Sequence, residues 1–338
     1  MTIALPTTLL RTRAAVEPAL RAAVDSLDPD SALLARYHFG WTDVHGRPAS
    51  AGGGKAVRPA FALLSAQAAR CDAEVAVPGA VAVELVHNFS LLHDDLMDGD
   101  IERRHRRTVW AEWGAPAAIL CGDALLALAT QVLLDVGTLD AVGAARLLAT
   151  TTQELIRGQH LDLAFEQRAD VRVDDCLDMA AGKTGALLAC SAAIGAVLAG
   201  ADAHIVDALA TYGAELGLSF QLIDDLLGIW GDPATTGKPV GSDLRTRKKS
   251  LPITWAVEHG GGYGHDLAAW LATDGPDSDD EVAVAANLVE SAGGRAWAAE
   301  EARRRLALGE RALDAVDIDA DARDELVALG RFIVTRES

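Results

Sequence analysis

The sequence predicts an all-α protein, and three observations lead to that class. Strong helix formers, chiefly Ala, Leu, Glu and Arg, dominate the 338 residues. Apolar residues recur at intervals of three and four along most of the chain, which is the spacing of one helix face. No alternating run of Val, Ile or Thr between turn dipeptides indicates a strand. Half of the residues are hydrophobic, which is ample for a large core.

The helices are expected in the following order. Seven longer helices are predicted at 7–27, 56–71, 75–99, 115–135, 139–168, 173–200 and 203–230. Shorter ones follow at 251–258, 264–272, 279–291, 294–315 and 319–334. Pro116 suits the first turn of the helix at 115–135. The run Gly231-Asp232-Pro233 ends the long helix at 203–230. Loops are expected at 40–54, 231–250 and 273–280, where Gly, Pro and charged residues gather.

The net charge of −19 limits the partners. It argues against binding to nucleic acid or to anionic membranes, because both attract basic surfaces. The uncharged stretch 184–201 is rich in Ala and Gly, and we expect a buried core helix rather than a membrane insertion. The N-terminus lacks the features of a signal peptide. Four scattered cysteines without metal-ligand spacing indicate reduced thiols in a cytoplasmic protein.

Two aspartate clusters stand in otherwise apolar helical stretches. The first covers 91–98 (Leu-Leu-His-Asp-Asp-Leu-Met-Asp) and the second covers 220–228 (Phe-Gln-Leu-Ile-Asp-Asp-Leu-Leu-Gly). Residues one helical turn apart share a face, so Asp94 and Asp98 stack, with Asp95 beside them. The matching stripe of the second cluster consists of Gln221, Asp224, Asp225 and Gly228. Carboxylates on apolar faces need cations or donors, and two such faces would suit Mg²⁺ that shares its shell with substrate phosphate.

Cationic groups gather around these clusters. Residues 53–59 (Gly-Gly-Lys-Ala-Val-Arg-Pro) open a helix, whose free N–H groups would form an anion site with Lys55 and Arg58. The run 103–107 is Arg-Arg-His-Arg-Arg. The segment 182–185 (Gly-Lys-Thr-Gly) interrupts a helix, and its glycines would let Lys183 and Thr184 point at a phosphate. Metal-bound carboxylates with several separate cations predict two polyanionic substrates.

These motifs together resemble the trans-isoprenyl diphosphate synthases, or polyprenyl synthetases. The resemblance covers the glycine-lysine motif, the DDxxD-RR segment, the lysine-threonine kink, the FQLxDD segment and the GKP loop, in the expected order from 53 to about 252. It implies a single domain over 1–338 with the isoprenoid synthase type I fold, helices around a deep central cavity and C-terminal helices over 260–338. It also implies a homodimer that joins isopentenyl diphosphate head to tail to an allylic diphosphate.

The resemblance assigns a role to each site residue. Mg²⁺, about three ions with diphosphate bound, would be held by Asp94, Asp95, Asp98, Asp224 and Asp225, with the second pair on the opposite wall. The allylic diphosphate would be held by Arg103, Lys183, Gln221 and Lys238, and Thr184 would be a further substrate-binding residue. Isopentenyl diphosphate would be held by Lys55, Arg58, His87 and Arg104. The catalytic set would be Asp94, Asp95, Arg103, Lys183 and Asp224. Tight binding of the departing pyrophosphate would lower the barrier to C–O cleavage. The resemblance also implies that the released pyrophosphate takes the final proton.

The chain departs from the family pattern at a few positions. Ala56 replaces an arginine, which removes one isopentenyl diphosphate contact. Gly228 replaces the last carboxylate of the second cluster, and Asp232, one turn beyond, is expected to substitute through water. His105 and Arg107 replace the common Gly and Pro after the arginine pair. None of these departures removes a residue that we consider indispensable.

Product length is expected to depend on the helix before Asp94. Ser90, four positions before Asp94, is small and leaves the first turn of the product cavity open. Phe89, five positions before Asp94, lies about 7.5 Å from it along the helix axis and would form the floor of that cavity. In the family, an aromatic residue here without an insertion in the cluster resembles enzymes that make C20 geranylgeranyl diphosphate. C20 is therefore the preferred product, with C15 and longer chains as alternatives.

Several residues also have plainer explanations. Arg106 and Arg107 fit an exposed charge run, and His93 fits a packed histidine better than a ligand. Asp162 is left without an assigned role. Two other functions compete: a class I terpene cyclase, which would not need the second aspartate pair or Lys55, and a non-catalytic partner subunit, which would typically lose one cluster. A di-iron site and a P-loop are both excluded by missing partner residues.

Overall fold

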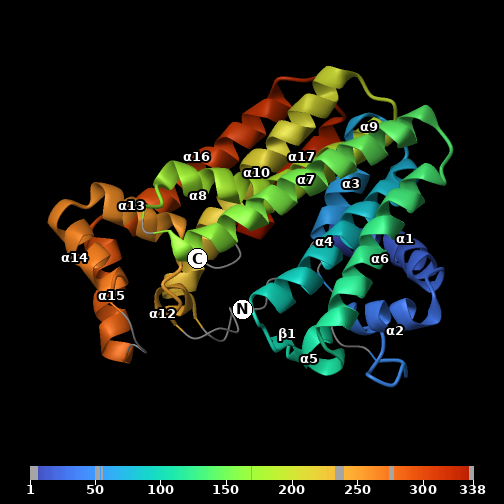
Figure 1. The fold of residues 1–338 in the computed structure, drawn as a ribbon. Helices are drawn as coiled ribbons and strands as arrows, with labels where there is room; N and C mark the ends of the chain where they lie inside the picture. The colour runs from blue at the N-terminus through green and yellow to red at the C-terminus, as the bar shows by residue number, and fades with distance from the viewer. Residues whose placement is uncertain are drawn as a thin grey trace. The chain divides into compact units, whose positions relative to one another are not determined.

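The chain forms two compact units in a computed structural model, and Figure 1 shows its elements along the sequence. The structure describes residues 7–49, 54, 56–168, 170–232, 240–273 and 278–334. Unit 1 consists of Met1–Thr152, Cys190–Ala210 and Val316–Leu326. Unit 2 consists of Gln153–Ala189, Thr211–Ala315 and Val327–Ser338. The single domain expected over 1–338 stays a prediction.

Unit 1 is built around α4, which packs along α6 and α3. Its helices are α1 (Thr7–Asp25), α2 (Pro29–His38), α3 (Val57–Ala68), the 3₁₀ turn η1 (Ala73–Ala76), α4 (Val77–Met97), α5 (Val109–Trp113), α6 (Ala115–Leu134) and the first part of α7 (Leu139–Gln167). The side chain of Asp28 accepts hydrogen bonds from the first turn of α2, and Pro29 fits that turn because its missing N–H is not needed there. Buried Leu85 and Leu92 on α4 and Leu125 on α6 belong to the core that this packing creates.

Unit 2 places the second aspartate cluster on a long helix with shorter helices around it. Its elements include α8 (Val173–Ala180), the π turn η2 (Ala181–Gly185), α12 (Ser242–Arg245), α13 (Leu251–His259), α14 (Gly261–Leu271), α15 (Asp279–Ser291) and α16 (Gly294–Asp314). Four of the described helices have residues in both units: α7, α9 (Ala186–Leu198), α10 (Ala203–Trp230) and α17 (Ala320–Val334). A buried apolar cluster holds Ile229 of α10 against Leu244, Ile253 and Leu267. This cluster fixes the segment after the second aspartate pair.

The all-α prediction is confirmed, with corrections in the segments between the long helices. The short helices α2, α5 and α12 were not expected. The absence of strands was wrong at one place, because β1 (Glu102–Arg103) and β2 (Arg106–Arg107) pair antiparallel. Arg104 and His105 form the two-residue tip, and both have positive φ, as hairpin turns of type I′ require. The expected helix over 173–200 is interrupted by the π turn.

Among the residues that the structure describes, three helical stretches are long and apolar enough to cross a membrane by length and composition: Ala73–Met97, Ala115–Leu134 and Val173–Leu198. In the first and third, 67% of the most apolar window is buried inside the protein, whereas the figure for the second, α6, is 39%. The third stretch includes most of 184–201, so its burial agrees with the expected core helix. The exposed apolar side chains of α6 need another explanation.

A side chain at position 195 is expected to have a large effect on stability. A Cβ placed on this α9 residue would lie 1.9 Å from the backbone oxygen of Ala62 on α3. Gly195→Ala is therefore expected to lower the free energy of unfolding by about 1–3 kcal/mol, because α3 and α9 would have to separate. Chemical denaturation would measure it.

Gly143→Ala is the matched control. Its Cβ would meet Val197 at an ordinary 3.5 Å, and alanine favours helix. We expect a gain of about 0.5–1 kcal/mol from this variant. Equal free energies of unfolding for the two variants would contradict the prediction.

Candidate active site

The first aspartate cluster ends α4, and its three carboxylates differ in environment. Asp94 is half-buried and Asp98, the C-terminal cap of the helix, is exposed. Asp95 is only 1% exposed. Its Oδ1 accepts a hydrogen bond from Nε of Arg103 at 2.6 Å, and its Oδ2 is buried without a hydrogen-bond partner among the described residues. Burial raises the pKa of Asp95 to about 6 although Arg103 acts against this. Asp94 and Asp98 are thus the more accessible oxygen donors.

A second group of predicted residues converges in unit 1. Arg58, His87 and Arg104 all interact electrostatically with one another or with Glu84. The guanidinium of Arg104 lies over Gly54, 3.3 Å from where a Cβ would stand. Burial lowers the pKa of Arg58 and of His87, and neighbouring arginines lower that of His87 further. Asp95 also interacts with Arg104, but it is already paired with Arg103. The positive charges of Arg58, Arg103 and Arg104 thus exceed the negative charges of Glu84 and Asp95, so the group is suited to bind an anion.

Two predicted substrate-binding lysines, Lys55 and Lys238, lie outside the described residues. Their expected roles stay predictions. Arg58, His87 and Arg104, by contrast, lie in the described part of the chain and interact there, while their role in holding isopentenyl diphosphate also stays a prediction.

The sequence interpretation missed His38, which lines a cavity together with Asp95, Arg103 and Arg104. Its Nε2 is buried without a hydrogen-bond partner among the described residues. Burial lowers the pKa of His38 to about 3, and Arg104 and Arg103 add to the effect. The folded protein therefore holds this imidazole neutral at any pH near neutrality.

The low pKa of His38 predicts a pH dependence of stability. Below pH 6.5 the unfolded chain binds a proton that the folded state refuses until about pH 3. As the pH falls from 6.5 to about 3, the free energy of unfolding is thus expected to fall by about 1.4 kcal/mol per pH unit from this residue. Denaturation at pH 6 and pH 4 should show a shallower slope for His38→Gln than for the unmodified chain. An unchanged slope, or an equal change in the exposed control His265→Gln, would contradict this.

The explanation of Arg106 as an exposed charge was wrong. Its guanidinium lies 4.2 Å from the ring centre of Tyr37 and donates to the backbone oxygens of Tyr37 and Thr42 at 2.9 and 2.8 Å. The hydroxyl of Tyr37 donates in turn to the backbone oxygen of Arg107 at 2.8 Å. Arg106 therefore anchors the hairpin that carries Arg103 and Arg104. The side chain of Arg107 is exposed, as expected, and pairs with Glu112.

Phe89 is buried on α4, and its ring meets the ring of His93 edge-on at 4.8 Å. Nε2 of His93 lies 3.2 Å from the backbone oxygen of Ile119, and a Cβ on Gly122 would come within 2.3 Å of it. His93 is thus packed on α6, in line with the expectation of a packed histidine. Ser90 donates to the backbone oxygen of His87 at 2.8 Å, which leaves its small side chain turned along the helix.

The second aspartate pair, on α10, repeats the pattern of the first. Asp224 is exposed, whereas Asp225 is 4% exposed. Oδ1 of Asp225 accepts from Gln221 at 2.8 Å, and its Oδ2 accepts from the backbone N–H of Leu251 at 2.9 Å. Oε1 of Gln221 accepts from the hydroxyl of Thr184 at 2.8 Å. Burial raises the pKa of Asp225 to about 7, partly offset by Lys248.

The glycine-flanked kink is the π turn η2, which carries Lys183 and Thr184. A Cβ on Gly158 of α7 would lie 2.2 Å from the backbone nitrogen of Lys183, so glycine permits this close approach. The ammonium of Lys183 is paired with Asp162, the carboxylate that had no assigned role. A π turn of this kind often marks a functional position, which agrees with the predicted role of Lys183.

Two more residues join this site without having been predicted. Asp243 of α12 is buried, and its carboxyl lies over Gly228, within 2.4 Å of where a Cβ would stand. Lys248 interacts with Asp225, Asp243, Asp162 and Asp224; their charges outweigh its burial and raise its pKa. The carboxylate that stands beside Gly228 is thus that of Asp243, whereas Asp232 was expected to substitute there.

The donor chemistry of both clusters fits Mg²⁺. Within the described residues, no group of three or more His, Cys, Asp or Glu side chains converges closely enough to hold a metal. Mg²⁺ does not require such a cage, because it keeps several waters and takes one or two carboxylates plus substrate phosphate. The accessible oxygens of Asp94, Asp98 and Asp224, and the orphaned Oδ2 of Asp95, meet that requirement.

The chain matches one protein family and is similar to proteins of known activity. The family model of the polyprenyl synthetases matches residues 47–289. A (2E,6E)-farnesyl diphosphate synthase of Mycobacterium tuberculosis is 53% identical over 326 residues, covering 96% of this chain and 91% of that protein. A geranylgeranyl diphosphate synthase of the same species is 44% identical over 332 residues, covering 97% and 93%.

Solved structures agree in fold. A polyprenyl synthetase from Streptomyces coelicolor A3(2) superimposes with a TM-score of 0.93 at 54% identity, covering 98% of this chain and all of that one. A geranylgeranyl pyrophosphate synthase from Corynebacterium glutamicum, complexed with isoprenyl diphosphate and magnesium, reaches a TM-score of 0.84 at 27% identity, covering 99% of this chain and 100% of that one.

Proposed function

This chain belongs to the polyprenyl synthetase family, and from that premise we propose that it condenses isopentenyl diphosphate with an allylic diphosphate to give C15 farnesyl diphosphate. The family makes it an isoprenyl diphosphate synthase, a prenyltransferase of isoprenoid biosynthesis that uses a divalent metal. C15 takes precedence over the C20 expected from Phe89, because the farnesyl diphosphate synthase is the more similar of the two relatives.

The cluster of Arg58, His87 and Arg104 is the observation that favours a condensation reaction over cyclisation. The charges of Arg58 and Arg104 act on Glu84, and this excess of positive charge suits a diphosphate that binds without metal. A terpene cyclase binds one diphosphate and has no use for such a second site. Retention of both aspartate pairs also disfavours a non-catalytic subunit.

We propose that the carboxylates divide their work. Asp94, Asp98 and Asp224 would bind Mg²⁺ directly, because they are the accessible members. Asp95 and Asp225 would hold Arg103 and Gln221 in place, since one oxygen of each already accepts a hydrogen bond from these side chains. The second oxygen of Asp95, Oδ2, would be a further ligand of Mg²⁺. Bound Mg²⁺ would supply neutralising charge for the departing pyrophosphate.

The cations around the allylic diphosphate would complete the site. Lys183, Thr184, Gln221 and Lys248 would bind its oxygens, and they would bind more tightly as negative charge collects there during C–O cleavage. The alkene of isopentenyl diphosphate then forms the new C–C bond, and a proton is lost to the released pyrophosphate. Apolar helix walls would exclude water from the allylic cation.

We further propose a cytoplasmic homodimer without stable membrane insertion or nucleic-acid binding. The exposed apolar side chains of α6, Leu120 at 64% and Ile119 at 43%, support a second copy of the chain as their cover. The net charge of −19 disfavours both anionic membranes and nucleic acid.

The deciding assay incubates the purified full chain with Mg²⁺, isopentenyl diphosphate and either dimethylallyl or geranyl diphosphate. Chromatography of the dephosphorylated products is expected to give farnesol. Unconsumed isopentenyl diphosphate together with a cyclic hydrocarbon would identify a cyclase instead. No product from the chain alone would favour a subunit that needs a partner.

Phe89→Ala is expected to lengthen the main product by at least one C5 unit. Phe89 is buried, and its removal would open space about one and a half turns below Asp94. Product chromatography measures the shift, and Ser90→Ala is the matched control because it leaves a small side chain. An unchanged product distribution in Phe89→Ala would show that this ring is not the floor.

A further inference from the structure

Three consecutive basic residues, Arg247, Lys248 and Lys249, lie between α12 and α13, and their contacts lie in different places. Arg247 contacts α14, Lys249 contacts the end of α7, and Lys248 interacts with the carboxylates around the second aspartate pair. This basic run thus contains two anchored residues on either side of one whose charge interacts with the carboxylates of the site.

Arg247 is held in an unusual backbone conformation. Its φ is +54°, in the left-handed region that costs a non-glycine residue about 1–2 kcal/mol. Its guanidinium carbon lies 3.4 Å from the ring centre of Trp270, and Nη2 donates to the hydroxyl of Thr273 at 3.1 Å. That hydroxyl donates in turn to the backbone oxygen of Trp270 at 2.7 Å. A cation–π contact of this kind can offset the backbone cost.

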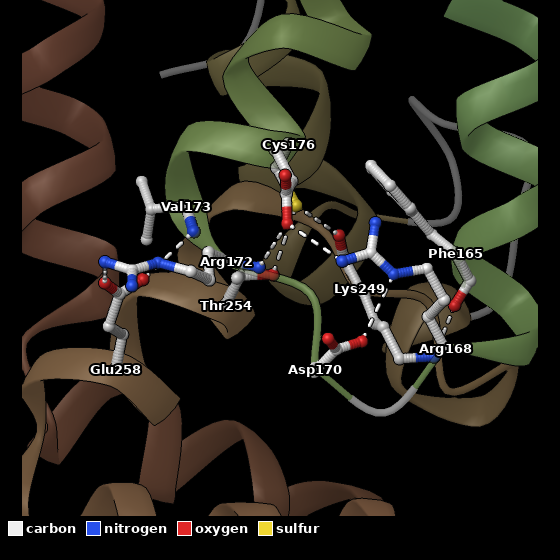
Figure 2. A network of polar contacts seen from close by, with 10 residues as sticks. Phe165, Arg168, Asp170, Arg172, Val173, Cys176, Lys249, Thr254 and Glu258 are labelled. Atoms are coloured by element: carbon white, nitrogen blue, oxygen red, sulfur yellow. Dashed lines mark hydrogen bonds and ion pairs between the residues drawn. The ribbon is translucent and has the colours of Figure 1, made fainter.

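Lys249 is fixed from the other side, as Figure 2 shows. Its ammonium donates to the backbone oxygen of Phe165 at 2.6 Å. Its own backbone oxygen accepts from the thiol of Cys176 at 3.2 Å, and that sulfur lies 3.4 Å from the hydroxyl of Thr254. The chain is therefore anchored immediately after Lys248.

Lys248 lies between the two anchors. Its backbone N–H donates to the backbone oxygen of Asp243 at 2.8 Å. Three residues further on, the backbone N–H of Leu251 donates to Oδ2 of Asp225 at 2.9 Å, which brings that carboxylate to this segment. The charges of Asp225 and Asp243 are the two that act most strongly on the Lys248 ammonium. A flexible lysine has substantial rotamer entropy, so a fixed backbone on both sides reduces the number of directions in which its ammonium can point.

We propose that Arg247 is a positioning residue: stacked on Trp270, it holds the left-handed backbone at 247 and so directs the ammonium of Lys248 toward Asp225 and Asp243, beside the proposed site of Mg²⁺ and diphosphate. The inference rests on the proposed function, because it takes that site to be where Mg²⁺ and diphosphate bind. The guanidinium of Arg247 contacts Trp270 and Thr273, so its effect on the site is expected to pass through Lys248.

The test measures binding of Mg²⁺–pyrophosphate to the full chain by calorimetry, together with kcat and the KM of the allylic diphosphate. Arg247→Ala is expected to weaken pyrophosphate binding about tenfold, the usual effect of losing a residue that orients a ligand-binding group. It should raise the KM more than it lowers kcat. Trp270→Leu, which removes the stack from the other side, is expected to give a similar loss.

A double variant separates positioning from a purely structural role. If Arg247 acts through Lys248, adding Arg247→Ala to Lys248→Ala should change affinity no further. Arg295→Ala is the matched control, since Arg295 also lies over a tryptophan, Trp230, at 4.9 Å, in the same unit. This control should leave pyrophosphate affinity unchanged.

Two results would overturn the inference. One is full affinity in folded Arg247→Ala and Trp270→Leu, with folding checked by circular dichroism. The other is multiplicative losses from Arg247→Ala and Lys248→Ala. If instead the unmodified chain binds no Mg²⁺–pyrophosphate and elongates no primer, the proposed function is wrong and the inference falls with it.

Discussion

Asp94→Asn is expected to lower kcat for prenyl transfer about 10³-fold, with little change in stability. Asp94 is the more open member of the first pair, and the amide removes the negative charge that would hold Mg²⁺. Loss of one charge-stabilising group in a transition state typically costs 10²–10³-fold, and a metal ligand belongs at the upper end. Steady-state assays across a range of Mg²⁺ concentrations would measure the loss and the expected rise in metal requirement.

The matched control is Asp72→Asn. It makes the same change in charge at an exposed position of unit 1 and is expected to leave kcat unchanged. Near-normal activity of Asp94→Asn at ordinary Mg²⁺ would remove Asp94 from the proposed metal site. A large fall in unfolding temperature would point instead to a structural role.

Lys183→Ala is expected to lower kcat about 10²–10³-fold, the cost of losing one preorganised charge near a leaving group. The π turn presents this lysine, and Asp162 pairs with it. Without the ammonium, the negative charge that develops on pyrophosphate loses one of its counter-charges, and Asp162 adds repulsion. Single-turnover kinetics would separate this effect on C–O cleavage from any effect on product release.

Arg157→Ala provides the comparison for Lys183. Arg157 is an exposed cation of unit 2, paired with Glu154 and Asp178, and its loss is expected to leave kcat within about twofold. The role of Lys183 would be contradicted if both variants lost activity equally. It would also be contradicted if Lys183→Ala raised only the KM of isopentenyl diphosphate.

Sequence periodicity predicted the long helices because their apolar faces are repeated over many turns. The helix expected at 203–230 is found there, and the glycines at 182–185 correctly indicated an interruption. The hairpin at 102–107 could not be predicted, since strands of two residues have no measurable alternation. Its tip also lacks the glycine that signals such a turn, because Arg104 and His105 adopt positive φ themselves.

The site residues that could be predicted are those that stand in short sequence motifs. Both aspartate pairs and the cations at Arg58, Arg104 and Lys183 follow from local spacing. Asp243 and Lys248 were missed because they join Asp225 only through tertiary contacts, across about twenty residues of chain with no periodic pattern. Burial, which separates Asp95 and Asp225 from their accessible neighbours, likewise depends on packing that a single sequence does not reveal.

The pairing of Gly228 with Asp243 bears on protein engineering. A designer who restores the family's usual carboxylate at position 228 would place its first carbon within 2.4 Å of the carboxyl of Asp243. The two positions are therefore coupled, and a substitution copied from a consensus sequence would have to be accompanied by a smaller residue at 243. Libraries that introduce a carboxylate at position 228 should therefore vary positions 228 and 243 together.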